Sequence, residues 1–237
     1  MQQIPFTISY KNRLNLSDKV MHTDEDYQKS IFTTHVKKHG AFKGDAVSRI
    51  LLRIVRHYFT DNILDIGAGS GTLIKLLKSR GFDAKGVDLY STSDDIQQGS
   101  ITDLPFADKS FNTVFCCDVI EHLTNEQIEK GLRETARVLK RQGHLIITTP
   151  YNEELKQNSL VCPKCGHEFH RYGHLQSFDE KRIAELLSNY GFQVSFLKIY
   201  ALGAMVKVPL GRYIHFILKR LQFDFVGKTM VIVAQYV

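Results

Sequence analysis

The stretch Asn62–Leu77, NILDIGAGSGTLIKLL, constrains the fold of this 237-residue chain more than any other. It begins with an apolar run interrupted by Asp65, which is too short for a typical helix and is typical of a buried parallel strand. Three glycines follow: Gly67, Gly69 and Gly71. Glycine lets the backbone adopt left-handed angles and lie close to a ligand. From Thr72 the apolar residues recur with a helical period. The stretch thus predicts a strand, a turn and a helix, and by itself it fits a nucleotide-binding corner and an ordinary tight turn equally well.

The composition indicates a soluble α/β domain with a sizeable core. Hydrophobic residues make up 43% of the chain, and 31 Lys and Arg against 25 Asp and Glu give a net charge of +6. That charge permits an anionic partner, although a mildly basic solvated surface explains it as well. The opening residues, MQQIPFTISYKNR, lack the apolar core of a signal peptide, and four cysteines in two close pairs do not form a secreted disulfide framework. We therefore expect a cytoplasmic protein, and no oligomeric state is predicted.

Strands and helices alternate along the rest of the chain, which predicts a parallel sheet with right-handed crossovers. Residues 1–60 read as an N-terminal arm and cap helices, with one apolar face over residues 50–58. Thr124 is a predicted N-cap for a helix over residues 126–139. After the first strand, the expected strands cover residues 84–89, 96–101, 113–118, 144–149, 192–200 and 229–236.

Asp88 strengthens the nucleotide interpretation of the glycine turn. It lies near the end of the second strand, 17 residues after Gly71. In a βαβ nucleotide site, a carboxylate at about this distance accepts hydrogen bonds from the ribose hydroxyls. The alternative is a carboxylate that caps a helix or loop.

Four segments in order resemble the class I S-adenosylmethionine-dependent methyltransferases of the small-molecule type. They are ILDIGAGSG, the acid of GVDLY, LPFADKSFNTVFCCDVIEHL and VLKRQGHLIITTPYN. The resemblance implies a Rossmann-like, doubly wound α/β sheet of seven strands, mostly parallel, with an antiparallel seventh strand inserted between strands 5 and 6. The methyltransferase domain would cover residues 61–237, with inserts at 151–177 and 205–227.

The resemblance also implies roles for residues at matching positions. The glycines would hold the methionine end of the cofactor, with Asp65 ordering the turn and Asp88 holding the ribose. Ser100 and Ile101 would flank the adenine, although many relatives have an acid where Ser100 stands. Cys117 and Asp118 would lie beside the transferred methyl group. The full predicted cofactor-binding set is Asp65, Gly67, Ala68, Gly69, Gly71, Asp88, Leu89, Ser100, Ile101, Cys117 and Asp118.

His122 is the predicted catalytic residue. A sulfonium is already activated, so the protein chiefly aligns the acceptor and excludes water. A general base helps when the acceptor is a hydroxyl, and histidine titrates near neutral pH. In the alternative interpretation, Glu121 and His122 only form hydrogen bonds with the neighbouring backbone.

The segment Val161–His174 carries a Cys-Pro-x-Cys-Gly pair followed by three histidines. Such a pair is typical of a zinc knuckle, in which a turn directs two thiolates at one metal. The predicted ligands of a structural zinc are Cys162, Cys165, His170 and His174, with His167 as a nearly equal alternative to either histidine. A redox pair, a disulfide and unliganded thiols are the competing interpretations. Methyltransferases similar to this chain also carry a CPxCG...FHxxGH insert, and some without the cysteines keep a histidine at position 174, which would then face the acceptor.

Residues 210–221 form an apolar helical stripe flanked by basic side chains. A helix of this kind packs on its own domain, lies on a membrane surface or covers a lipid-like substrate. We therefore include peripheral membrane contact among the expected partners of the chain.

The predicted function is methyl transfer from S-adenosylmethionine to an oxygen or nitrogen of a small or lipid- or carrier-linked acceptor. An RNA or protein methyltransferase is one alternative, favoured by the positive charge and the knuckle, but we expect no nucleic-acid partner. A non-catalytic cofactor-binding scaffold is the other alternative, and the intact glycines and Asp88 argue against it.

Overall fold

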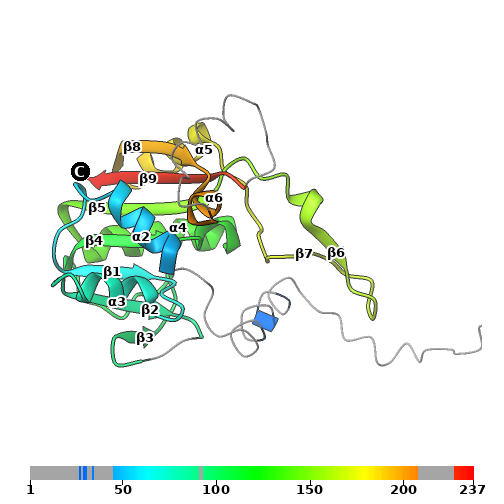
Figure 1. The fold of residues 1–237 in the computed structure, drawn as a ribbon, viewed down its shortest axis with the longest axis horizontal. Helices are drawn as coiled ribbons and strands as arrows, with labels where there is room; N and C mark the ends of the chain where they lie inside the picture. The colour runs from blue at the N-terminus through cyan, green and yellow to red at the C-terminus, as the bar shows by residue number, and fades with distance from the viewer. Residues whose placement is uncertain (1–26, 28, 31–33, 35–44, 91–92, 208–226) are drawn as a thin grey trace, which may run out of the picture.

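The computed structural model describes residues 27, 29–30, 34, 45–90, 93–207 and 227–237. The fold is a twisted sheet covered by helices on both faces, with a small hairpin standing away from it (Figure 1). None of the helices within these ranges is long and apolar enough to cross a bilayer. The predicted arm at the N-terminus and the basic stripe at 210–221 lie outside the described residues.

The central sheet has seven strands, as predicted. Their spatial order is β3 (Ile96–Gln98), β2 (Ala84–Asp88), β1 (Ile63–Ile66), β4 (Phe111–Cys117), β5 (Leu139–Pro150), β9 (Thr229–Tyr236) and β8 (Phe192–Tyr200). The first five are parallel neighbours, and β9 runs antiparallel to both β5 and β8. This confirms the mostly parallel sheet with an antiparallel last strand between the fifth and sixth.

Alternate residues of the central strands face two separate cores, because successive side chains of a strand point to opposite faces. In β4, Val114 and Cys116 face the core beneath α4 (Asn125–Val138) and α5 (Glu180–Ser188), whereas Phe115 faces the other core. That second core lies beneath α2 (Asp45–Ile54), α3 (Thr72–Lys78) and α6 (Leu202–Lys207). Burial on both faces explains the nearly continuous apolar runs of these strands.

Several boundaries differ from the sequence prediction. β3 ends at Gln98 instead of residue 101, because the chain turns at Gly99 and forms an isolated bridge between Ser100 and Asp103. β5 begins at Leu139, which was expected to end the preceding helix, because Leu139 pairs with Phe111 of β4. The predicted N-cap is confirmed: the Thr124 hydroxyl accepts from the backbone N–H of the third residue of α4, which closes a capping box.

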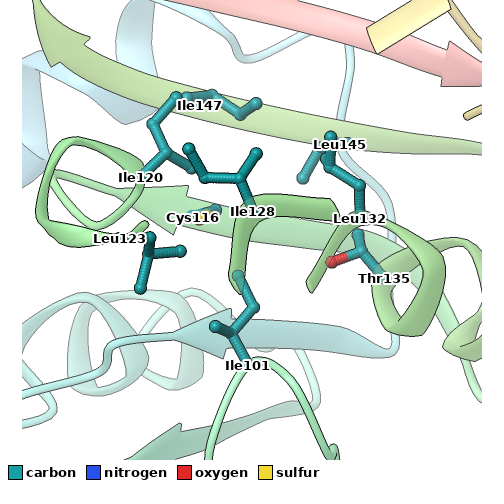
Figure 2. A pocket seen from close by; sticks show the side chains of 9 residues that line it. All are labelled: Ile101, Cys116, Ile120, Leu123, Ile128, Leu132, Thr135, Leu145 and Ile147. Atoms are coloured by element: carbon teal, nitrogen blue, oxygen red, sulfur yellow. The ribbon is translucent and has the colours of Figure 1, made fainter. Parts of the chain in front are cut away.

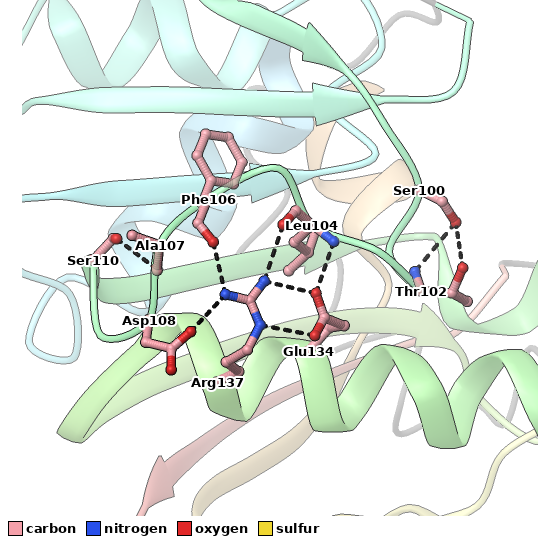
Figure 3. A network of polar contacts seen from close by, with 9 residues as sticks. All are labelled: Ser100, Thr102, Leu104, Phe106, Ala107, Asp108, Ser110, Glu134 and Arg137. Atoms are coloured by element: carbon pink, nitrogen blue, oxygen red, sulfur yellow. Dashed lines mark hydrogen bonds and ion pairs between the residues drawn. The ribbon is translucent and has the colours of Figure 1, made fainter.

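The connection from β3 to β4 is held in place by one arginine of α4, Arg137 (Figure 3). Its guanidinium donates to the carbonyl oxygens of Leu104 and Phe106 at 3.0 and 2.7 Å and to the Asp108 carboxylate at 2.8 Å. It also donates to Glu134, which in turn accepts from the Leu104 N–H at 2.8 Å. Arg137 and Glu134 therefore fix the Leu-Pro-Phe segment against α4, shortly before β4 begins.

Candidate active site

The glycine turn after β1 needs glycine for steric reasons. Gly67 has φ +74°, and a Cβ atom there would lie 2.4 Å from Cγ2 of Val119. Gly69 has φ +52° and open space beyond it, with no described atom within 4 Å of the position that a Cβ atom would take. Gly71, with φ +72°, donates its N–H to the Ala68 carbonyl at 2.8 Å as α3 begins. The turn therefore packs closely against the chain on one side and leaves room for a ligand on the other.

Ala68 and Asp88 tie this turn to the end of β2. The N–H groups of Gly67 and Ala68 donate to the Val87 carbonyl, and Ala68 is buried. The Asp88 carboxylate accepts from Gly69 N–H and from Tyr90 N–H, both at 2.8 Å. A carboxylate has about four acceptor positions, so an Asp88 oriented by these bonds can also accept from ribose hydroxyls.

Two exposed apolar side chains follow Asp88. Leu89 is 51% exposed and Tyr90 is 44% exposed. Ser100 lies across the same edge of the sheet, where its hydroxyl shares a hydrogen bond of 2.8 Å with the Thr102 hydroxyl. The open space over the glycines, the oriented carboxylate and this apolar rim fit the methionine, ribose and base parts of S-adenosylmethionine.

Asp65 is buried inside β1, with 4% of its surface exposed. Burial raises its pKa to about 8, and the negative charge of Asp88 adds to the shift. Its carboxyl group therefore holds a proton at neutral pH. The predicted role of Asp65 in ordering the turn stays a prediction.

The side chain of Ile101 faces the core. It lies against Gly131 of α4 and lines a small apolar cavity between α4 and the sheet (Figure 2). The cavity, also lined by Cys116, has a volume of about 10 Å³, about the space that one water needs. It is a packing gap and not a ligand site, and the predicted place of Ile101 beside the adenine stays a prediction.

Cys117 is the last residue of β4 and Asp118 follows it, at the edge where ligands of open α/β sheets bind. Asp118 has φ +53°, and its carboxylate accepts from the Thr148 hydroxyl at 2.9 Å. Burial raises the pKa of the Cys117 thiol well above its ordinary value, so Cys117 is not a thiolate nucleophile. Their predicted place beside the transferred methyl group stays a prediction.

A cluster of acids and histidines follows in η2 (Ile120–His122) and in the segment before α5. Nδ1 of His122 lies 3.0 Å from the Gly173 carbonyl, and the His122 ring meets the His174 ring edge to face, with centroids 4.8 Å apart. Glu121 is only 1% exposed, and its backbone carbonyl accepts from Leu175 N–H at 2.7 Å. Burial, followed by the neighbouring His174 imidazole, lowers the pKa of His122 to about 4. His122 is therefore neutral at pH 7 and a weaker base than an ordinary histidine.

The structure does not bring the four predicted zinc ligands together. The insert forms a hairpin of β6 (Ser159–Val161) and β7 (Glu168–His170), in which His170 pairs with the first residue of β6 at the foot. The cysteines lie in the turn at the other end of the hairpin, where Gly166 N–H donates to the Cys162 carbonyl. Because a strand rises about 3.3 Å per residue, foot and tip are kept apart. No metal-ligating group of three among the described residues includes Cys162, Cys165 or His167.

The cysteines and the histidines of the predicted zinc site have different partners. Sγ of Cys165 lies 3.2 Å from the Tyr27 hydroxyl, and Tyr27 stacks on His167 and Phe169. Tyr27, together with backbone N–H groups of the turn, lowers the pKa of the Cys162 thiol to about 6.

The histidines lie instead with Glu153. Nδ1 of His174 is 2.5 Å from Oε2 of Glu153, and Nε2 of His170 is 3.5 Å from Oε1. Sequence reasoning missed Glu153. A signal was present, since Glu153 follows shortly after the fifth strand, and the carboxyl ends of parallel strands meet at one edge of the sheet.

Fold and site together define an α/β domain that binds a nucleoside-containing cofactor at the carboxyl edge of its parallel strands. The family model described as a methyltransferase domain matches residues 36–195 of the chain. The chain therefore belongs to this family of methyltransferases, whose cofactor is S-adenosylmethionine.

Curated relatives agree with this assignment. Demethylmenaquinone methyltransferase of Thermotoga maritima is 26% identical over 170 residues, which cover 59% of this chain and 73% of that protein. Ubiquinone biosynthesis O-methyltransferase of Rickettsia akari is 26% identical over 176 residues, covering 64% and 66%. The uncharacterized methyltransferase YcgJ of Bacillus subtilis is 30% identical over 107 residues, which are 39% of this chain and 42% of that relative. The matches thus span between about two fifths and three quarters of these relatives.

Solved structures share the fold. A methyltransferase from Methanosarcina mazei that depends on S-adenosylmethionine has a TM-score of 0.57 at 19% identity, covering 78% of this chain and 97% of that one. The 1,6-didemethyltoxoflavin-N1-methyltransferase of Burkholderia thailandensis, solved with S-adenosylhomocysteine, has a TM-score of 0.60 at 15% identity, covering 90% and 86%. At these identities the likeness shows the fold alone.

Proposed function

We propose that this chain transfers the methyl group of S-adenosylmethionine to an oxygen or nitrogen of a small or lipid- or carrier-linked acceptor. One observation carries the proposal. Gly67 of the cofactor turn packs directly against Val119, and the next residues form η2, which bears Glu121 and His122. The cofactor turn and the polar cluster are therefore neighbours, as a donor site and an acceptor site must be.

The bound cofactor supplies an activated methyl group, and the chain positions the cofactor and the acceptor. Asp88 and the glycine turn would hold the nucleoside and methionine parts, so that the methyl group faces the end of β4 at Asp118. His122, neutral at pH 7, offers a ring nitrogen to the acceptor side of the site. Relatives named as quinone methyltransferases support a small, lipid-linked acceptor.

Isothermal titration calorimetry with S-adenosylmethionine tests the cofactor part of the proposal. Asp88→Asn should weaken binding about 10- to 100-fold, because a hydrogen bond to a charged group contributes roughly 1.5–3 kcal/mol. The exposed Asp94 provides a matched control, and Asp94→Asn should bind as the unchanged protein does. The assignment of Asp88 and the turn would be refuted if the unchanged protein is folded but does not bind the cofactor. Equal affinities of Asp88→Asn and Asp94→Asn for the cofactor would refute it as well.

The acceptor is tested by mass spectrometry of small-molecule and lipid extracts incubated with isotope-labelled cofactor. A labelled methyl group on an oxygen or nitrogen of a small or lipid-linked molecule is the expected product. Label found only in RNA or protein would overturn the acceptor class and leave methyl transfer intact.

A further inference from the structure

Two overlapping groups of metal-ligating side chains lie at the acceptor side of the site, and they share His174. One group is Glu121, His122 and His174, and the other is Glu153, His170 and His174. In each group the potential ligand atoms all lie within 4.8 Å of one another. The hydrogen bonds around the imidazole rings distinguish the two groups, because a neutral histidine has a lone pair on only one of its nitrogens.

The ring of His170 is in the wrong tautomer for the second group. Its Nδ1 accepts from the backbone N–H groups of Tyr172 and His174, at 3.3 and 3.1 Å, and so carries the lone pair. The proton is then on Nε2, which lies 3.5 Å from Oε1 of Glu153. The His170 side chain is 5% exposed. An N–H group at this position faces the Glu153 carboxylate without a hydrogen-bond partner among the described residues, and it cannot bind a metal.

His122 and His174 have the opposite tautomer. Nδ1 of His122 faces the Gly173 carbonyl at 3.0 Å, and Nδ1 of His174 faces the Glu153 carboxylate at 2.5 Å. Both partners are acceptors, so both Nδ1 atoms carry the proton and both Nε2 atoms carry the lone pair. Metal-binding histidines typically donate their other ring N–H to a carboxylate or a backbone carbonyl in this way.

Glu121 supplies the third ligand, and its buried carboxylate is the strongest reason to expect a bound cation. Both of its carboxylate oxygens are buried, and neither has a hydrogen-bond partner among the described residues. An unpaired buried carboxylate is costly, and proteins usually pair such a group or use it to coordinate a metal. Its backbone carbonyl accepts from the N–H groups of Leu175 and Gln176, which anchors the segment carrying His174 against η2.

We infer that Glu121, His122 and His174 bind a divalent cation of the Zn²⁺ type, with Glu153 and the Gly173 carbonyl orienting the two imidazoles. Two histidines and one carboxylate form a common set for zinc with an open fourth position. Ligand atoms around a tetrahedral zinc lie roughly 3.4 Å apart, given bond lengths near 2.1 Å, so small side-chain shifts close the site. The metal is thereby assigned to the acceptor edge of the sheet and not to the cysteine turn. That the open position would take an oxygen of the acceptor rests on the proposed function.

The test is Zn²⁺ binding to chelator-treated full-length protein without cofactor, measured by calorimetry and elemental analysis. We expect one equivalent of zinc, a loss of at least 100-fold in affinity for Glu121→Gln and for His174→Ala, and a loss of about 10- to 100-fold for Glu153→Gln. Cys162→Ser is the control and should bind as the unchanged protein does. Circular dichroism and titration with S-adenosylmethionine show whether each variant is folded, and Glu121→Gln changes the shape of the side chain least.

Substitution by Co²⁺ gives an independent measurement, because thiolate ligands add a strong charge-transfer absorption that nitrogen and oxygen ligands lack. We expect no thiolate absorption. No zinc bound by the unchanged protein, or zinc lost in Cys162→Ser and kept in Glu121→Gln, would overturn the inference. Neither result would affect the proposed methyl transfer, since cofactor binding is measured separately.

Discussion

Asp65 should make the stability of this protein fall as the pH rises from about 4 to 8. Its carboxyl group is buried in β1, and burial raises its pKa from 3.8 to about 8, with Asp88 adding to the shift. Between these two pH values the folded state keeps a proton that the unfolded chain has lost. The free energy of unfolding then decreases with pH, by about 1.4 kcal/mol per unit for one group.

The variant Asp65→Asn isolates this effect, because asparagine does not titrate. From pH 5 to pH 8 the Asp65 contribution should fall by about 3.5 kcal/mol, allowing for partial ionisation at each end. The unchanged protein should lose that much stability relative to Asp65→Asn over this range. Any constant cost of placing an amide in β1 cancels, because only the change of the difference with pH is used.

The assay is guanidinium denaturation at pH 5 and pH 8, followed by far-ultraviolet circular dichroism. Asp94→Asn, on the exposed turn before β3, is the control and should leave the pH dependence unchanged. A difference between Asp65→Asn and the unchanged protein that stays constant within about 0.5 kcal/mol would refute the reasoning.

Two further pairs of variants test the packing around the site. Gly67→Ala should lower the free energy of unfolding by about 2–4 kcal/mol, because the backbone is left-handed and the added Cβ atom would lie 2.4 Å from Val119. Gly69→Ala meets open space, so it should lower the free energy of unfolding by only about 1–2 kcal/mol, and it should weaken cofactor binding. Equal losses in denaturation experiments would contradict this. Arg137→Met should lower the free energy of unfolding by about 2–3 kcal/mol, because it leaves carbonyl and carboxylate partners unpaired. Lys130→Met breaks only an exposed ion pair with Glu126 and should leave the stability nearly unchanged. Comparable melting temperatures for the two variants would show that the Arg137 network contributes little.

Features encoded within a few consecutive residues were predictable. The strand, turn and helix around Gly67 follow from an apolar run, a glycine spacing and a change of period. Thr124 caps α4 because a hydroxyl and a glutamine three residues later suffice to close a capping box. The boundaries of β3 and β5 were not predictable to the residue, because pairing with neighbouring strands decides where each one ends.

Local periodicity and spacing are sufficient to predict an alternating α/β fold, the glycine turn and an acid at the end of the second strand, and the family resemblance adds the cofactor. Which acids and histidines meet depends on the tertiary structure. The spacing of four residues close in sequence predicts one zinc site, but the extended hairpin separates Cys162 at its tip from His170 at its foot. Strand order and the anchoring of the segment before α5 then place His174 beside Glu121 and Glu153, from two distant parts of the chain. Contacts of this kind depend on through-space geometry, which residue spacing does not report.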